Sequence, residues 1–150
     1  MAEEFDPLKL ENQLCFPLYA CSKEIVRRYA PLLEPLDLTY TQYITMMLMW
    51  EHRQMTVKEL GGKLWLDSGT MTPVLKKLEA KGYIRRERST KDERSVAAVL
   101  TDEGMALREK ALAVPAKVGS CVRLDVQEMV QLHLLLHKIM AGFEQEAAAD

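Results

Sequence analysis

The chain of 150 residues lacks a long hydrophobic run, although 48% of its residues are hydrophobic. No apolar stretch approaches the roughly 20 residues that a helix needs to cross a bilayer. Its first seven residues, Met-Ala-Glu-Glu-Phe-Asp-Pro, are acidic and contain no apolar core, so they do not resemble a signal peptide. The composition is typical of an ordinary globular protein. We therefore expect one domain over residues 1–150, in the cytoplasm, with no membrane partner.

Cysteine is scarce, and an odd number of cysteines, Cys15, Cys21 and Cys121, does not suit a disulfide framework. On one helix, Cys15 and Cys21 would be rotated about 120° and separated by about 9 Å along the axis, which is beyond disulfide reach. If a disulfide forms, Cys121 is the expected partner. No Cys/His spacing resembles a zinc site, and His133 and His137 stand alone. We expect no metal and no cofactor.

The net charge of −2 hides an uneven distribution. Residues 56–100 carry ten Lys or Arg against six Asp or Glu, a net charge of +4, whereas the rest carries ten against sixteen, or −6. Basic charge concentrated in one segment is typical of a nucleic-acid-binding surface on an otherwise acidic protein. A solvated basic face is the alternative, and charge alone does not decide between the two.

Apolar residues at helical spacing dominate the first third of the chain. They predict a long helix from about Pro7 to Leu33, with either a kink or a helix start near Pro17. Residues 40–51 are apolar nearly all round, which predicts a buried helix. We interpret the Met and Trp side chains of this helix as core rather than as a cofactor site.

The middle of the chain has the pattern of a winged helix-turn-helix, over about residues 40–100. Thr56-Val-Lys-Glu59 is a capping box that begins a helix ending near Trp65. A tight turn leads to a second helix, with Asp67 or Ser68 as N-cap, Pro73 tolerated in its first turn and Gly82 at its end. Residues 83–88 and 95–100 are predicted strands around a polar tip. Two short helices followed by a hairpin make the winged module.

The helices outside this module carry spare apolar surface. Thr101 caps a helix to about Val118, and Asp125-Val-Gln-Glu128 caps a last one to about Gln145. The last helix has more apolar residues than a monomer core requires: Val130, Leu132, Leu134, Leu135, Leu136, Ile139, Met140 and Phe143. Such surface usually contacts a partner subunit. We predict a mainly α fold with a small β wing, forming a homodimer through helices at about 8–34 and 102–146.

The second helix of the module and the hairpin have the residue types that contact DNA. Small and hydrogen-bonding residues at the start of a recognition helix meet base edges, and cations further along meet phosphates. Arginine in a wing suits a narrow minor groove, and Asp92 is expected to hold Arg94 by a bidentate pair. The predicted DNA contacts are Ser68, Gly69, Thr70, Thr72, Lys76 and Lys77 on the helix, and Arg86, Arg88, Lys91 and Arg94 in the wing. A winged fold used for protein contact is the alternative, against which the basic wing argues.

The sequence resembles the MarR family of winged-helix repressors over about residues 8–145. The wing segment Lys91-Asp-Glu-Arg94-Ser95 fits the family's Asp-x-Arg-Ser signature. Three further segments are similar to the OhrR branch of organic-hydroperoxide sensors: Leu14-Cys-Phe, Leu38-Thr-Tyr40-Thr-Gln-Tyr43, and Leu66-Asp-Ser-Gly-Thr-Met-Thr-Pro-Val-Leu-Lys-Lys-Leu-Glu.

The resemblance implies a homodimer that binds a pseudo-palindromic operator when reduced and represses a gene for hydroperoxide detoxification. An organic hydroperoxide oxidises the cysteine that matches Cys15, and the tyrosines that hydrogen-bond this sulfur match Tyr29 and Tyr40. In one subgroup a second cysteine, here Cys121, resolves the sulfenic acid across the dimer; otherwise an external thiol does so. Cys121 follows an expected helix break at residues 118–120, which suits a mobile resolving thiol. We expect Cys21 to be a bystander, with reaction of Cys21 in its place as the alternative.

The thiol chemistry needs a stabilised thiolate, because the thiolate is the nucleophile and thiols are only slightly ionised at neutral pH. Two phenol hydroxyls that donate to the sulfur would favour the anion. An apolar lining, for which Phe16, Trp50 and the Met46–Met49 run are candidates, would favour organic hydroperoxides. Three alternatives stay open: a MarR-type repressor released by a small aromatic ligand, a thiol peroxidase that happens to bind DNA, and a protein-interaction module.

Overall fold

The computed structural model describes residues 5–149. The chain divides into two compact units, one up to Val118 and the other from Gly119 onward. The elements of the chain, in order, are η1 (Leu10–Asn12), α1 (Cys15–Leu33), η2 (Glu34–Leu36), α2 (Tyr40–His52), β1 (Gln54–Thr56), α3 (Val57–Leu64), α4 (Ser68–Ala80), β2 (Ile84–Arg88), β3 (Val96–Leu100), α5 (Asp102–Ala111), α6 (Val114–Gly119) and α7 (Val126–Ala149).

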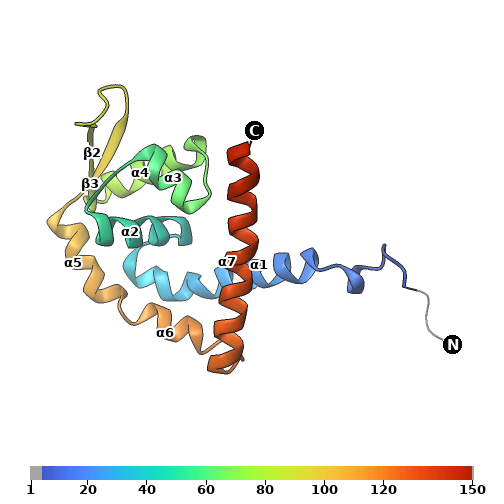
Figure 1. The fold of residues 1–150 in the computed structure, drawn as a ribbon. Helices are drawn as coiled ribbons and strands as arrows, with labels where there is room; N and C mark the ends of the chain where they lie inside the picture. The colour runs from blue at the N-terminus through green and yellow to red at the C-terminus, as the bar shows by residue number, and fades with distance from the viewer. Residues whose placement is uncertain (1–4, 150) are drawn as a thin grey trace. The chain divides into compact units, whose positions relative to one another are not determined.

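The first unit contains the predicted winged helix-turn-helix, together with α1, α5 and most of α6. In it α2 lies between α1 and the α3–α4 pair, and the β2–β3 ribbon extends away from the helices (Figure 1). Met46 and Met49 of α2 are fully buried, as are Met71 and Leu75 of α4. The core of this unit therefore fixes α4 against α2, as expected from the apolar character of residues 40–51.

The sheet has three antiparallel strands in the order β1-β3-β2. Ile84 lies opposite Leu100 in the hairpin, and Gln54 lies opposite Val99 on the other side of β3. Sequence periodicity did not predict β1, because three residues are too few to show alternation. Its pairing with a strand more than 40 residues away makes it a strand.

The helix caps follow the sequence closely. Thr56 and Glu59 form the predicted capping box of α3, and Asp67 is the N-cap of α4. Thr101 caps α5, and Gly82 adopts a positive φ of 79° just past the C-cap of α4. These local signals are strong because each satisfies backbone groups that have no partner within the helix.

Several predicted helix bounds were wrong, and proline accounts for two of them. The long helix begins at Cys15 rather than near Pro7, which confirms the alternative of a helix start near Pro17, a residue that the first turn of a helix accommodates. The helix expected over 102–118 is split into α5 and α6, because Pro115 cannot donate to the carbonyl of Ala111. Pro73 lies in the second turn of α4, not the first. The last helix continues past Gln145 to Ala149.

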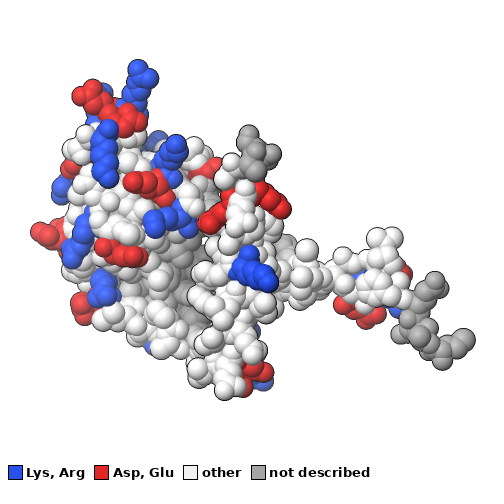
Figure 2. All heavy atoms as spheres, in the orientation of Figure 1, with Lys and Arg blue, Asp and Glu red and all other residues white. Residues whose placement is uncertain are grey.

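Apolar side chains are exposed along α1 and throughout α7. On α7, described by itself, every residue from Val126 to Ala148 is exposed, including Leu134 and Leu135, and most of the surface that it presents in Figure 2 is uncharged. Such a face is unusual for a helix that stays in water. Among the described residues, no helix has the length and apolarity to cross a membrane.

Candidate functional site

Helix α4 has one buried face and one exposed face. Met71, Val74, Leu75 and Leu78 are buried. The opposite face carries all six predicted DNA contacts of the helix, and each of them is exposed: Ser68, Gly69, Thr70, Thr72, Lys76 and Lys77. The residues expected to read DNA therefore lie on one continuous surface.

The first turn of α4 is held by Asp67. Its carboxylate oxygen accepts a hydrogen bond from the backbone N–H of Thr70 at 2.7 Å. A Cβ at Gly69 would lie 3.2 Å from this carboxylate, so glycine leaves room for the cap. The hydroxyl of Thr72 donates to the carbonyl oxygen of Ser68 at 2.8 Å and keeps its oxygen lone pairs for a further donor.

The turn between α3 and α4 depends on a close backbone approach at Gly61. The N–H of Leu66 donates to the carbonyl oxygen of Gly61 at 2.9 Å, and Trp65 adopts the left-handed conformation with φ 57°. A Cβ on Gly61 would lie only 2.6 Å from the carbonyl oxygen of Leu66. The absence of a side chain here lets the turn close and so sets the angle of α4.

The wing tip is a hydrogen-bonded turn built around Asp92. Its carboxylate accepts from the backbone N–H of Arg94 at 3.0 Å, and its carbonyl oxygen accepts from the N–H and the hydroxyl of Ser95. Within the described residues no ion pair joins Asp92 to the guanidinium of Arg94, so the support acts through the backbone rather than through the bidentate pair that the sequence suggested. Arg88, Lys91 and Arg94 are exposed, and charged side chains of both signs cover the wing in Figure 2.

Arg86 differs from the other wing arginines. It is half-buried, its Nε donates to Glu79 Oε2 at 2.8 Å, and its backbone N–H donates to the other carboxylate oxygen. The side-chain and backbone hydrogen bonds from Arg86 lower the pKa of Glu79. This pair joins the wing to the recognition helix, a role that the sequence did not indicate, and the contact of Arg86 with DNA stays a prediction.

Lys81, at the C-cap of α4, reaches residues at the start of α2 and just before it. Its Nζ donates to the backbone carbonyl of Asp37 and to Gln42 Oε1 at 3.3 Å, and it forms an ion pair with the Asp37 carboxylate at 3.1 Å. Because these partners are 39 and 44 positions away in the sequence, no local pattern marks this lysine.

Cys15 is exposed at the first residue of α1. Tyr29 lies on nearly the same face of this helix, but 14 residues further on, which is about 21 Å along the axis. Tyr40 packs against Tyr29, with ring centroids 4.8 Å apart. One protomer therefore brings the two tyrosines together but keeps both away from its own Cys15.

The two tyrosines have polar tips in partly buried surroundings. Burial raises the pKa of Tyr40, and burial, followed by the proximity of Tyr40, raises the pKa of Tyr29. Both phenols therefore stay protonated at neutral pH and can donate a hydrogen bond.

The apolar lining expected for the thiol is only partly available. Phe16 is exposed beside Cys15, and Met47 is exposed as well. Met46 and Met49 are fully buried in the core, and Trp50 donates its indole N–H to the carbonyl of Gly104 at 2.8 Å. These last three side chains hold α2 in place and do not surround the thiol of their own protomer.

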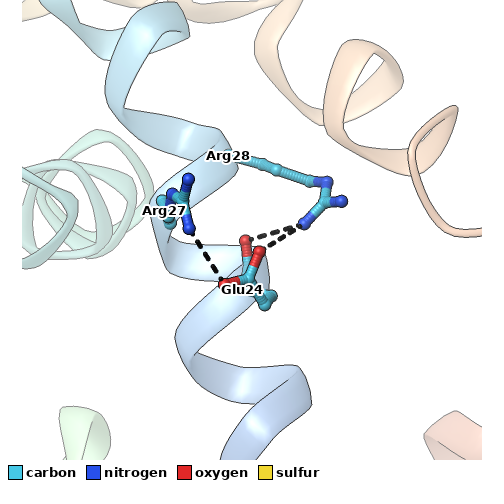
Figure 3. A network of polar contacts seen from close by, with 3 residues as sticks. All are labelled: Glu24, Arg27 and Arg28. Atoms are coloured by element: carbon cyan, nitrogen blue, oxygen red, sulfur yellow. Dashed lines mark hydrogen bonds and ion pairs between the residues drawn. The ribbon is translucent and has the colours of Figure 1, made fainter.

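Charged residues lie on the side of α1 opposite Cys15. Glu24 pairs with Arg27 at 3.3 Å and with Arg28 at 3.1 Å (Figure 3). Glu24 follows Cys15 by nine residues and so lies half a turn round the helix from it. The face that carries Cys15 holds instead the exposed apolar side chains of Leu18, Ile25 and Val26.

The other two cysteines are exposed as well. Cys21 is exposed on α1, about 120° round the helix from Cys15. Cys121 is exposed in the second unit, just after α6 ends at Gly119. The expected helix break before Cys121 is confirmed.

Comparison with known proteins gives concordant matches. The family model of the transcriptional regulator SarA/Rot matches residues 27–111. The chain is 45% identical to the organic hydroperoxide resistance transcriptional regulator of Bacillus subtilis, over 97% of this chain and 99% of that protein. It is 43% identical to the HTH-type transcriptional regulator SarZ of Staphylococcus haemolyticus, over 90% and 92% of the two chains.

Solved structures match as well. Reduced AbfR bound to DNA has a TM-score of 0.75 and 32% identity, with 91% of this chain and 93% of that chain covered. Disulfide-formed AbfR has a TM-score of 0.59 and 33% identity, with 91% and 90% covered. Since the family model covers more than half of the chain and its winged helix-turn-helix is present, this chain belongs to the winged-helix, MarR-like transcriptional regulators of the SarA/Rot type.

Proposed function

We propose that the protein is a homodimeric repressor that binds pseudo-palindromic operator DNA and releases it when an organic hydroperoxide oxidises Cys15. The observation that carries the proposal is the exposed Cys15 at the start of α1, in a chain that also exposes a recognition helix and a wing. Relatives at 32% identity or more are named as a hydroperoxide resistance regulator and as DNA-bound reduced AbfR. The protein acts in this proposal as a regulator and not as an enzyme, without a cofactor, in the cytoplasm where its DNA lies.

The homodimer follows from two exposed apolar faces. Phe16, Leu18 and Ile25 are exposed on α1, as is Leu14 just before it, and at least nine large apolar side chains are exposed on α7. Burying such surfaces against a second copy removes apolar area from water. A dimer also places two recognition helices side by side, as a two-fold symmetric operator requires.

The dimer would complete the thiol site. Since Tyr29 and Tyr40 cannot reach Cys15 of their own chain, we propose that they donate to Cys15 of the partner subunit. Two antiparallel copies of α1 would set the start of one helix against the end of the other. Neutral phenol donors at this position would stabilise a thiolate without adding a competing charge.

The reaction is a two-electron oxidation of sulfur. The Cys15 thiolate attacks the terminal oxygen of the hydroperoxide, the O–O bond breaks, and the alkoxide leaves and takes a proton to become the alcohol. The product is a sulfenic acid. Attack by the Cys121 thiol of the partner subunit would then form a disulfide and release water; without it, an external thiol would do so. In either case the change at sulfur disturbs the hydrogen bonds of Tyr29 and Tyr40.

DNA recognition divides between α4 and the wing. Ser68, Gly69, Thr70 and Thr72 are proposed to meet base edges, and Lys76 and Lys77 to meet phosphates. Arg88, Lys91 and Arg94 are proposed wing contacts. Oxidation would displace the two recognition helices from successive major grooves, because their spacing depends on the dimer helices.

The proposal is tested by adding about one equivalent of cumene hydroperoxide to the reduced protein, followed by a non-reducing gel, mass spectrometry and DNA binding. Cys15 should be oxidised and DNA released, Cys15→Ser should keep its DNA, and Cys21→Ser, the matched control on the same helix, should respond as the wild type does. A covalent dimer linked through Cys15 and Cys121 would assign the resolving thiol. Release of DNA from Cys15→Ser by the hydroperoxide would overturn the proposal.

A second candidate function has one observation in its favour. A cavity of about 370 Å³ lies between α2 and α5, with Trp50, Met47 and Leu112 as apolar lining and Arg108 beside them. A small aromatic acid is the candidate ligand, since its ring suits the apolar wall and its carboxylate suits Arg108, although the Glu51 carboxylate also lines the cavity. Release of DNA from the Cys15→Ser variant by such an acid, and not by hydroperoxide, would favour this function.

A further inference from the structure

We propose that Lys81 is a positioning residue through which the Tyr40 end of α2 controls the recognition helix α4. The inference rests on the proposed function, because it concerns how oxidation at the thiol reaches the DNA-binding surface. It adds to that function a specific physical link between the start of α2 and the end of α4, made by Lys81 with Asp37 and Gln42.

The ammonium group of Lys81 contacts three protein oxygens. It donates hydrogen bonds to the backbone carbonyl of Asp37 and to Oε1 of Gln42, and it forms an ion pair with the Asp37 carboxylate. The Lys81 side chain is 24% exposed. By contrast, Lys76 and Lys77 on the same helix are exposed. Lys81 is therefore less available to DNA phosphates than Lys76 and Lys77 are, and its charge is paired with Asp37 at the edge of the unit.

The partners of Lys81 are themselves held in place. Gln42 is 2% exposed, and its Oε1 also accepts from the backbone N–H of Thr39 at 3.1 Å, which closes the capping box of α2. Asp37 adopts the left-handed conformation with φ 52° between η2 and α2. An ordered turn and a buried amide leave Lys81 little freedom to move without its partners.

The same end of α2 carries the proposed sensor tyrosine. Tyr40 is the first residue of α2, next to the N-cap Thr39 and two positions from Gln42. Lys81 is the C-cap of α4. A displacement of Tyr40 moves the first turn of α2, and with it the oxygens of Asp37 and Gln42 that hold Lys81. The end of the recognition helix then moves as well.

Packing also joins α2 to α4, and Met46 and Met49 of α2 belong to the same buried core as Met71 and Leu75 of α4. These apolar contacts are non-directional and tolerate small sliding. Hydrogen bonds to a charged group are directional and weaken steeply when they are misaligned. The clamp made by Lys81, Asp37 and Gln42 is therefore suited to report a small shift of the Tyr40 end.

The test compares operator affinity in the reduced and oxidised states. The probe is a fluorescent duplex that the reduced protein has selected from random-sequence DNA, and oxidation uses one equivalent of cumene hydroperoxide. The ratio of the oxidised Kd to the reduced Kd measures the coupling between the two sites. Lys81→Met keeps the aliphatic stem and removes the charge. It should lower this ratio at least about tenfold while the reduced affinity and the rate of Cys15 oxidation stay close to wild type.

The matched control is Lys77→Met, which removes one charge from the exposed face of the same helix. It should weaken DNA binding in both states and reduce the salt dependence, with an unchanged ratio. Asp37→Asn is the second variant: asparagine tolerates the left-handed conformation, and the side chain it replaces is 80% exposed, so folding is preserved. It should lower the ratio in the same direction as Lys81→Met.

The outcomes separate the two levels of the proposal. A wild-type ratio near one overturns the proposed function itself. A large wild-type ratio that Lys81→Met and Asp37→Asn both leave unchanged overturns the role of Lys81 alone. A ratio lowered in both variants, with Cys15 oxidised at the wild-type rate, supports the clamp, since a merely structural role would change the reduced affinity first.

Discussion

Two adjacent glycines of α3 offer a sharp comparison, since only one of them lies against the backbone of the helix-turn-helix. A Cβ at Gly61 would lie 2.6 Å from the carbonyl oxygen of Leu66, whereas a Cβ at Gly62 meets nothing within 4 Å. Both positions lie within the same helix, Val57–Leu64. Substitution by alanine therefore gives each variant the same gain in helix propensity, about 0.5–1 kcal/mol.

The two variants should differ by the cost of the close contact. Overpacking in a fitted structure costs about 1–3 kcal/mol, and the atom in the way at Gly61 is backbone, which cannot rotate aside. Gly62→Ala should therefore stabilise the protein by about 0.5–1 kcal/mol, and Gly61→Ala should be less stable than Gly62→Ala by about 1–3 kcal/mol. For a chain of this length, that difference corresponds to a separation in Tm of roughly 2–12 °C.

Thermal unfolding followed by circular dichroism measures this difference, at one protein concentration because dimer formation makes Tm depend on concentration. Operator affinity should fall with Gly61→Ala and stay unchanged with Gly62→Ala, since only the former opens the turn that sets the angle of α4. Equal Tm values for the two variants would refute the close approach as the reason for glycine at position 61.

Two further predictions concern α4. Asp67→Ala should lower the free energy of unfolding, measured in urea, by about 1–2 kcal/mol, since it removes both the N-cap acceptor and a negative charge at the positive end of the helix. Asp67→Asn keeps the acceptor and should cost less than half of that. Equal losses in the two variants would argue against the cap. Hydrogen bonds from Arg86 hold the pKa of Glu79 below its usual range, so the contribution of this pair is present above the ordinary Glu pKa of about 4.3 and is lost as the pH falls through the lowered folded value. The urea midpoints of the wild type and Glu79→Gln should therefore differ at neutral pH and converge in acid, and a difference that stays constant down to about pH 3 would contradict the pairing.

The local elements of this protein could be read from the sequence because their signals lie within a few residues. Thr56 and Glu59 cap α3, Asp67 caps α4, and Gly82 ends it with a positive φ. Each of these residues either hydrogen-bonds unpaired backbone groups at an end of its own helix or allows the chain to turn away there, so the ends of these helices could be predicted without tertiary information. The family resemblance, carried by the cysteine segment, the recognition helix and the wing, is confirmed by the comparisons.

The contacts of the candidate site residues were harder to predict from the sequence than the helix ends, because they depend on the fold. Arg86 and Arg88 have the same side chain and lie two residues apart, yet one pairs with Glu79 and the other is exposed. Sequence reasoning assigned both to DNA, because the partner of Arg86 lies on another element. Likewise, the resemblance grouped Cys15 with Tyr29 and Tyr40, whereas helix geometry separates Cys15 from Tyr29 by about 21 Å within one chain.

Local sequence by itself determined the helix caps, the apolar and exposed faces of α4 and the polar tip of the wing, since helix and strand periods place side chains on faces without reference to the rest of the chain. Tertiary structure alone decided that β1 is a strand, that Gly61 must lack a side chain, and that Lys81 faces Asp37 and Gln42. Each of these three features depends on a backbone or side-chain group that a turn or the folding of distant segments brings close. Patterns along the sequence do not predict such distances.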